Sequence, residues 1–369
     1  MSKAADLART ASASETALSN RNVVTNGAMQ ISQRSASVTG ITGDGYYTLD
    51  RWDSRINTMG TWTQSQSTDV PTGAGFATSL KMDCTTADAS PAAGDNVRFF
   101  YGIEGQDLQQ LKYGTADAEQ LTLSFWVKAT KTGVNVVTLY QDDGTKSISG
   151  TYTIGTTNTW EYKTLTFVGN TADVIANDNT RGLLCIWQLG AGSDRTSGTL
   201  RTTWTAYAVA DEAVGQVNNA DSTSNDWYIT GVQLEVGTVA TPFEHRSYGQ
   251  ELALCQRYFF IGCSSNNADT GGQANGSFRT TSNAQVLQQH PIAMRTNPTT
   301  ALRASGSVVI HDTNDGNNIN VTAIDAVVMQ SIKSTIFGLT LASASGATGD
   351  GCWTYSATST PGITFDAEL

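Results

Sequence analysis

Hydrophobic and polar residues alternate in short runs along most of this chain, from about Val23 onward. In the segment LTLSFWVKAT, residues 121–130, the aliphatic residues and Phe125 share one side, while Trp126 shares the other side with Thr, Ser and Lys. Successive side chains of a β-strand point to opposite faces of its sheet. The pattern therefore predicts a half-buried strand, with Trp126 on the face that is turned away from Phe125.

Several further runs of the same kind follow as far as about Tyr248. They are GVNVVTLY, GTYTI, EYKTLTFVG, GLLCIWQLG and DWYITGVQLEVG, and turn-forming pairs such as Asp143-Gly144 separate them. Strands at this spacing with no helical segment between them are typical of an antiparallel β-sandwich. We therefore expect residues 23–250 to form a sandwich of the jelly-roll kind.

The first 22 residues have a different pattern. Their first 20 contain no Gly or Pro and are rich in Ala, Ser and Leu, and five small or apolar residues recur at a spacing of three and four: Ala4, Leu7, Ala11, Ser14 and Leu18. This spacing places them on one side of a helix. A lone helix of this length is marginal in water, so it would pack on copies of itself or on another protein. A frayed tail is the alternative.

A second departure is SYGQELALCQRYFF, residues 247–260, which predicts a helix of two or three turns. Beyond it the strand-like runs return as SFRTT, GSVVIHDT, AVVMQSI and IFGLTLAS, joined by Asn-, Gly- and Ser-rich loops. Residues 251–369 are therefore expected to form a smaller β domain preceded by this helix. The whole chain is predicted to be mainly β.

Charge and composition narrow the choice of partners. The net charge is −11 and the pI about 4.7, without a cluster of basic residues. Binding to nucleic acid or to an anionic membrane needs clustered Lys and Arg, so neither is expected. No segment is apolar enough to span or insert into a membrane, and the N-terminus lacks the apolar run of a signal peptide.

The five cysteines are odd in number and scattered, at Cys84, Cys185, Cys255, Cys263 and Cys352. No pair has the spacing of a metal site, and a chain of this size does not need a disulfide framework. We expect reduced, mostly buried thiols in a chain that is assembled in a cytosol.

The sequence contains few candidates for catalytic or metal-binding residues. No nucleophile motif is present, and the three histidines lie far apart. Asp50, Asp53 and Glu235 are carboxylates that could serve glycoside hydrolysis, but ion pairing and hydrogen bonding within the sandwich explain them better. Asp142 and Asp143 are weak candidates for calcium, because a hairpin turn accounts for Asp-Asp-Gly equally well. We predict no catalytic residue and no cofactor, although structural calcium is compatible with a jelly roll.

Aromatic residues are better candidates for a binding site, and the chain contains 8 Trp and 12 Tyr. The C–H faces of sugars stack on aromatic rings, so exposed rings on a β-sandwich can bind glycan without chemistry. Trp126, Trp204 and Trp227 are the candidates for such stacking. A place in the core is the alternative for each of them, and Trp187 is predicted to face the core because it alternates with Cys185 and Leu189.

The order of several sequence blocks resembles a family of tailed-bacteriophage virion proteins, which are tail-fibre and structural proteins. The blocks are NVVTNGAMQISQRS, YYTLDRW, LTLSFWVKATKTG, TWEYKTLTFVGNT, GLLCIWQLGAGS, WYITGVQLEVGTVATPFEHRSYGQELALCQRYF and the final FDAEL. The resemblance extends from Asn22 almost to the end and is strongest between Gln233 and Tyr258. TNGAMQ and FWVKA are also similar to jelly-roll carbohydrate-binding modules.

This resemblance implies a jelly-roll domain on a homotrimeric protein at the surface of the virion, on its tail or its head, assembled in the host cytoplasm. Residues 1–22, with Ala4, Leu7, Ala11 and Leu18 on the helical side, would then attach the chain to other virion proteins. The function expected is a non-enzymatic fibre or spike for host attachment that binds host-surface polysaccharide. Two alternatives stay open: a head decoration, head fibre or adaptor protein that binds only virion proteins, and a polysaccharide-degrading spike.

Overall fold

A computed structural model of the chain describes residues 20–262, 274–356 and 362–369. The contacts divide the chain into two compact units, Met1–Glu251 together with Leu369, and Leu252–Glu368. The chain is mainly β with antiparallel sheets, so the predicted fold class is confirmed. Ala4, Leu7, Ala11 and Leu18 lie outside the described residues. None of the helices in the described ranges has the length and apolar character needed to cross a bilayer.

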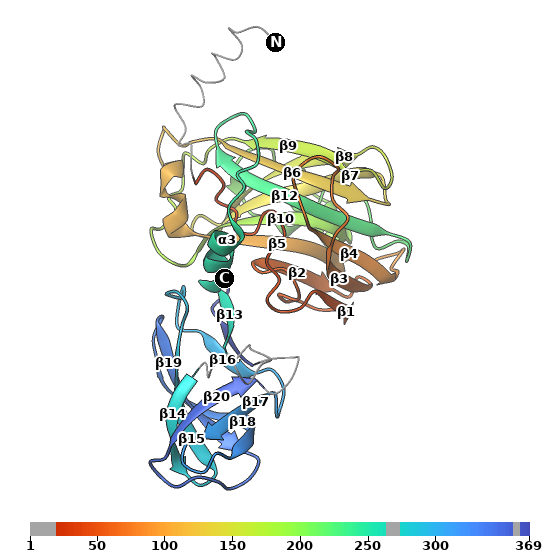
Figure 1. Ribbon diagram of the computed structural model, residues 1–369. Helices are drawn as coiled ribbons and strands as arrows, with labels where there is room; N and C mark the ends of the chain where they lie inside the picture. The colour runs from red at the N-terminus through yellow and green to blue at the C-terminus, as the bar shows by residue number, and fades with distance from the viewer. Residues whose placement is uncertain (1–19, 263–273, 357–361) are drawn as a thin grey trace. The chain divides into compact units, whose positions relative to one another are not determined.

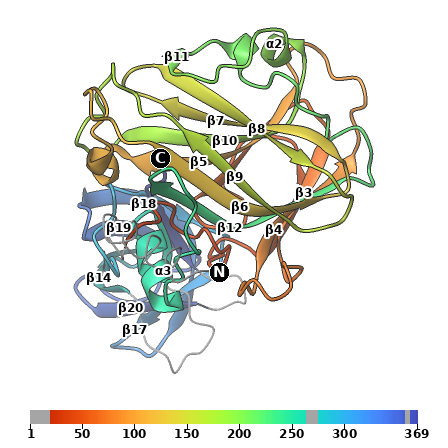
Figure 2. The ribbon, with the colours of Figure 1, turned by 90° about the horizontal axis from the view of Figure 1, so that it is seen from above.

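The first unit is a sandwich of two six-stranded antiparallel sheets, seen from two sides in Figures 1 and 2. One sheet has the strand order β1-β3-β4-β12-β6-β9 and the other the order β11-β8-β7-β10-β5-β2. The strands are β1 Ser37–Ile41, β2 Trp52–Asn57, β3 Thr61–Ser67, β4 Ser79–Thr86, β5 Asn96–Glu104, β6 Leu121–Ala129, β7 Gly133–Gln141, β8 Lys146–Ile154, β9 Glu161–Phe167, β10 Arg181–Ala191, β11 Thr205–Ala206 and β12 Asp226–Val236. Short helices η1 Gly105–Leu111, α2 Ser193–Thr196 and η2 Val209–Asp211 lie in the connections.

Strand β6 shows how the alternation builds the sandwich. Leu121, Leu123, Phe125 and Val127 are completely buried between the sheets, whereas Trp126 on the opposite face is only partly buried. The predicted orientation of this strand is therefore confirmed. The predicted hairpin at Asp143-Gly144 connects β7 to β8, which pair in register along their whole length.

Large aromatic rings fill the space between the sheets. The rings of Trp52 and Phe99 stack 5.1 Å apart, and Trp187 lies 5.5 Å from Trp52. Trp227 is also completely buried, 6.0 Å from the ring of Phe99, so its assignment to an exposed stacking surface is wrong. The reason is its place on β12, where it pairs with the core residue Ala129 of β6.

Thiols are part of the apolar interior. Cys84, Cys185 and Cys352 are buried. Burial raises the pKa of Cys84 and of Cys352 to about 11 and that of Cys185 to about 12, because a thiolate loses its hydration in an apolar surrounding.

The second unit combines a closed barrel with a small sheet. The barrel has the order β14-β15-β19-β18-β17-β20, and the three-stranded sheet the order β13-β21-β16. Its elements are β13 Phe259–Gly262, β14 Ala274–Thr280, β15 Asn283–Gln289, β16 Thr299–Leu302, β17 Val308–Asp312, β18 Asn318–Gln330, β19 Ser334–Leu341, β20 Gly351–Ser356 and β21 Ile363–Asp366. Helix α3, Tyr248–Gln256, precedes them where a short helix is predicted. Phe260 stacks on Phe365 with ring centroids 4.6 Å apart, which ties β13 to the final strand.

The core position of Trp227 gives a stability prediction. Trp227→Ala should lower the free energy of unfolding of the sandwich by about 3–5 kcal/mol, because it removes a buried indole from a packed core. Trp126→Ala is the matched control and should cost less than about 1 kcal/mol, because its ring is partly exposed. Urea denaturation followed by circular dichroism measures both, and equal losses for the two variants would contradict this assignment.

Candidate functional site

An open groove of about 670 Å³ lies on the outer face of the sheet that contains β6. Three strands and two connecting segments contribute to it. Its lining residues are Ala74, Phe76, Ser124, Trp126, Tyr162, Gly231, Ala240, Thr241, Pro242, Phe243 and His245. None of these described residues carries a carboxylate, an ammonium or a guanidinium group.

Two aromatic side chains from neighbouring strands form the floor of the groove. Trp126 of β6 and Tyr162 of β9 are direct partners in the antiparallel register, so both point to the outer face. Their ring centroids lie 5.4 Å apart and the ring planes are tilted by 49°. Tyr162 keeps 46% of its surface exposed. The pair presents ring surface that the core of the sandwich does not use.

The first wall comes from the connection between β3 and β4, which contributes Ala74 and Phe76. Phe76 packs against Gly231 of β12, and a Cβ atom at Gly231 would lie only 2.5 Å from the tip of the Phe76 ring. Gly231 also has a φ of +62°, in the left-handed region, at an irregularity in the pairing of β12 with β6. This glycine is therefore needed both for the backbone conformation and for the position of the wall.

Asp69 anchors the same connection to the sheet. Its carboxylate forms an ion pair with Lys128 of β6 and accepts a hydrogen bond of 2.9 Å from the indole N–H of Trp160. Its backbone carbonyl accepts a hydrogen bond of 2.6 Å from the hydroxyl of Ser79. Partial burial alone would raise the pKa of Asp69, but the hydrogen bonds from Lys128 and Trp160 outweigh it and lower the pKa below its ordinary value.

The second wall is the irregular segment that follows β12, residues 240–245. Phe243 and His245 pack directly against Phe76 of the first wall: the centroids of the two Phe rings lie 5.0 Å apart, and the ring of His245 lies 5.4 Å from Phe76 and 4.9 Å from Phe243. Glu235 fixes the start of this wall, because its carboxylate accepts hydrogen bonds from the N–H and the hydroxyl of Thr241 at 2.9 Å and 2.6 Å.

The sequence candidates fall in three different places. Trp126 lines the groove. Trp204 does not; it packs edge-on against Tyr113 and donates its indole N–H to the carbonyl of Val168. Trp227 belongs to the core. Sequence reasoning did not single out Tyr162, although the alternation in EYKTLTF offered a signal for it. Phe76 lies in a connection without periodicity, and Phe243 and His245 alternate with polar residues over too short a run to predict a strand.

The acidic candidates are engaged elsewhere. Asp50 pairs with Arg34 at 3.9 Å, and Asp53 with Arg55 at 2.6 Å. Asp142 accepts two hydrogen bonds of 2.7 Å from the guanidinium of Arg181, whereas Asp143 accepts one from the N–H of Ala176. No group of three or more His, Cys, Asp or Glu side chains that could hold a metal ion occurs in the described part of the chain.

The outer face of the other sheet holds a smaller cavity of about 160 Å³. Phe100, Leu184 and Ile186 contribute its apolar surface, and Tyr207 packs over Tyr140 at 5.0 Å. The buried carboxylate of Glu212 pairs there with Arg98 and Arg195. Because the segment from α2 to η2 covers this face, the larger groove offers more accessible ring surface.

Comparison with known proteins gave matches to solved structures only. No protein family and no curated protein sequence matches the chain. The enzymatically active domain of tailspike protein 4 from bacteriophage CBA120 is similar over 59% of this chain and 22% of that chain, with 14% identity and a TM-score of 0.31. This chain therefore spans about a fifth of the tailspike structure.

Two carbohydrate-binding modules are among the other matches. A family 61 module in complex with β-1,4-galactotriose is similar over 59% of this chain and all of that one, at 9% identity and a TM-score of 0.29. A family 11 module from Clostridium thermocellum with a mixed-linked tetrasaccharide is similar over 56% of this chain and 98% of that one, at 7% identity and a TM-score of 0.28. At these TM-scores, only the residues of the groove itself bear on what this chain binds.

The anchoring of Asp69 predicts an acid dependence of the first wall. The ordinary pKa of this group is 3.8, and in the folded protein it should titrate below that value. The ion pair with Lys128 then contributes fully above pH about 4 and is lost as the pH falls through the lowered pKa. Carboxyl ¹³C NMR titration measures the shift directly.

Lys128→Met should return the pKa of Asp69 to its ordinary value or above, because partial burial then acts with less opposition. Lys112→Met removes a comparable ion pair with Glu119 and should leave the pKa of Asp69 unchanged. A wild-type Asp69 that titrates at or above 3.8 would refute the anchoring role.

Proposed function

We propose that this chain is a non-enzymatic bacteriophage virion protein whose sandwich binds a neutral oligosaccharide segment of a host-surface glycan. The observation that carries the proposal is the partly exposed pair Trp126 and Tyr162 on the floor of a 670 Å³ groove. Pockets of about 300–1,000 Å³ typically enclose ligands of drug size, so a short oligosaccharide fits this volume.

The lining chemistry supports a neutral ligand. Aromatic rings contact the C–H faces of sugars, and the hydroxyl of Tyr162, a residue that keeps 46% of its surface exposed, supplies a polar partner for sugar hydroxyls. A carboxylated sugar would enter a groove without a guanidinium or ammonium group to pair with, at a cost in desolvation.

The assignment to a virion is supported by the sequence blocks that resemble phage tail-fibre and structural proteins. The strongest of these blocks, between Gln233 and Tyr258, forms the end of strand β12, the second wall of the groove and helix α3. The proposed chain is a homotrimer at the virion surface, attached through residues 1–22. Several copies per particle would turn weak sugar contacts into firm attachment to a cell.

The absence of enzymatic activity is part of the proposal. Glycoside hydrolysis needs two carboxyl groups placed on either side of the scissile bond. None of the three candidate carboxylates lines the groove. Asp50 and Glu235 accept hydrogen bonds within the sandwich, and Asp53 forms an ion pair there.

Binding of the full-length protein to an array of neutral and uronic-acid-containing oligosaccharides tests this function. We expect saturable binding to neutral members, and Trp126→Ala or Tyr162→Ala should raise Kd by on the order of tenfold, since ring stacking contributes about 0.5–1.5 kcal/mol beyond the area it buries. Trp204→Ala is the matched control outside the groove and should leave Kd unchanged.

A reducing-sugar assay on the same samples separates binding from cleavage. Release of sugar would replace the proposal with a polysaccharide-degrading spike. No binding to the array, to intact bacteria or to their isolated surface polysaccharide would favour a decoration or adaptor protein that binds only other virion proteins.

A further inference from the structure

The second wall of the groove is a ribbon with two faces. Along residues 243–246, Phe243 and His245 line the groove, whereas Glu244 and Arg246 make their contacts on the other side. This alternation is that of an extended chain. The wall pairs with no strand of the two sheets, so side-chain contacts position it. Glu235 and Gln233 of β12 bind the N–H groups of Thr241 and Glu244. The contacts of Glu244 and Arg246 add a second attachment, away from β12.

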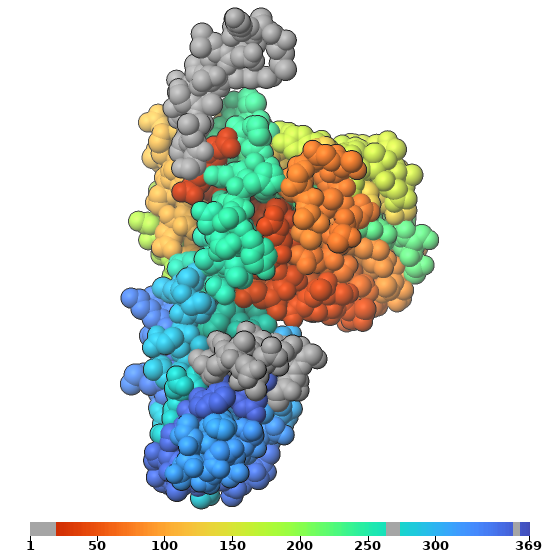
Figure 3. Space-filling view, viewed as in Figure 1, coloured from red at the N-terminus to blue at the C-terminus, as the bar shows by residue number. Residues whose placement is uncertain are grey.

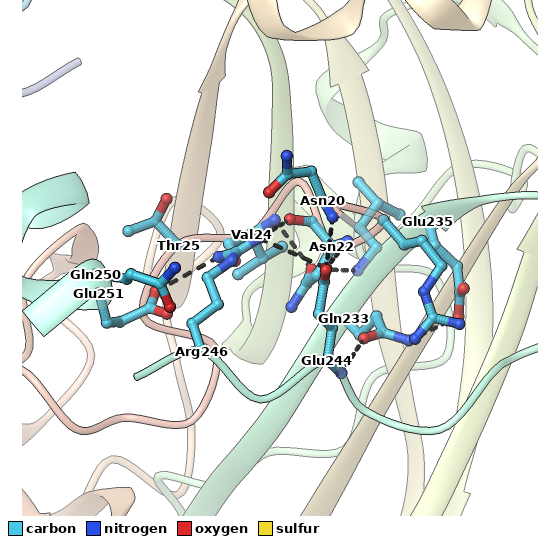
Figure 4. Close-up of polar contacts among 12 residues, drawn as sticks. Asn20, Asn22, Val24, Thr25, Gln233, Glu235, Glu244, Arg246, Gln250 and Glu251 are labelled. Atoms are coloured by element: carbon cyan, nitrogen blue, oxygen red, sulfur yellow. Dashed lines mark hydrogen bonds and ion pairs between the residues drawn. The ribbon is translucent and has the colours of Figure 1, made fainter. Parts of the chain in front are cut away.

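Those contacts go to the leading segment of the sandwich, which we define as residues 20–27. Figure 4 shows Glu244 at the centre of this network, and its carboxylate accepts hydrogen bonds from the backbone N–H groups of Asn20 and Asn22 at 2.6 Å and 2.8 Å. Arg246 donates to the backbone carbonyls of Asn22 and Val24. The two side chains also lie 3.8 Å apart as an ion pair.

Arg21 of the leading segment also contacts the wall. Its guanidinium donates a hydrogen bond of 2.8 Å to the hydroxyl of Thr241 and contacts the carbonyl of Pro242 at 3.4 Å. Both acceptors belong to residues that line the groove. The leading segment and the wall are therefore joined by side chains of both. In Figure 3 the red of the leading segment emerges at the surface beside the teal of the wall.

The leading segment is itself fixed to the sandwich. The side-chain amide of Asn22, which is buried, donates to the carbonyl of Val232 and accepts from the N–H of Leu234. Val23 donates its N–H to the carbonyl of Leu234 at 3.0 Å. Further along, Gly27 passes so close to β12 that a Cβ atom there would lie 2.1 Å from the carbonyl oxygen of Val232.

We infer that the leading segment positions the groove wall, with Arg21, Glu244 and Arg246 as positioning residues for the proposed glycan site. The identity of the ligand in this inference rests on the proposed function, whereas the contacts between the leading segment and the wall do not depend on it. Because coupling between two sites is reciprocal, a sugar that binds against Phe243 and His245 also stabilises the attachment of residues 20–27. These residues are the ones that connect the sandwich to the N-terminal 19 residues of the chain.

Amide hydrogen exchange of the full-length protein without ligand is the first arm of the test. Arg21→Met and Glu244→Gln should speed exchange at the wall amides of Thr241 and Glu244 roughly 3- to 10-fold, the range expected from one lost hydrogen bond. Asp143→Asn is the matched control, because it removes a carboxylate that accepts one backbone N–H on the other sheet. Unchanged exchange at the wall in both variants would overturn the inference, whatever the protein binds.

The second arm adds a neutral oligosaccharide that binds the wild-type protein in the array. Saturation should slow exchange at the amides of Asn20 and Asn22, which no sugar in the groove contacts directly, and Arg21→Met should weaken binding roughly 3- to 10-fold with an unchanged melting temperature of the second unit. A merely structural role for the network predicts no response of these amides to sugar, and that result would also overturn the inference.

The two arms separate the two proposals. If no oligosaccharide binds, the proposed function fails, while faster wall exchange in Arg21→Met and Glu244→Gln still supports the positioning role. If sugar binds and the wall does not respond to either variant, the function stands and the positioning role is wrong.

Discussion

The space between the two sheets of the sandwich must be filled with side chains, and this requirement determines which face of each strand is turned inward in the first unit. The indoles of Trp52, Trp187 and Trp227 fill it, which commits one face of each strand to the interior. Connections also pack on the outer face of β6, where Ser124 and Lys128 are buried. The paired rings of Trp126 and Tyr162 therefore differ from the indoles of the core in that they keep part of their surface exposed.

The two walls of the groove are stabilised in different ways. The first depends on a close fit between Phe76 and Gly231 and on the charged anchor at Asp69. The second has no sheet partner and depends on polar contacts with Gln233 and Glu235 of β12 and, through Glu244 and Arg246, with the chain's own leading segment. In both cases the rings of the groove are held before any ligand arrives, which lowers the entropic cost of binding for a flexible sugar chain.

The sequence predicted those features that follow from local alternation, among them strand β6, the outward position of Trp126 and helix α3. Trp227 shows where the interpretation failed despite a usable signal, because it alternates with Ile229 against Tyr228 and Thr230 in the manner of an inward-facing residue. The barrel of the second unit could not be predicted, since its closure depends on pairing between β14 and β20, which are distant in sequence. The positions of Phe243 and His245 could not be predicted either, because their alternation with Glu244 and Arg246 covers only four residues and the course of this connection is set by tertiary contacts.

The buried thiols have a consequence for the surroundings in which the chain can persist. Thiol oxidation and disulfide exchange proceed through the thiolate, and a pKa of about 11 leaves roughly 1 thiol in 10,000 ionised at neutral pH. Burial and the raised pKa together disfavour oxidation and disulfide exchange at Cys84, Cys185 and Cys352. We therefore expect the packing around these three positions to tolerate the exchange of a reducing compartment for an oxidising one.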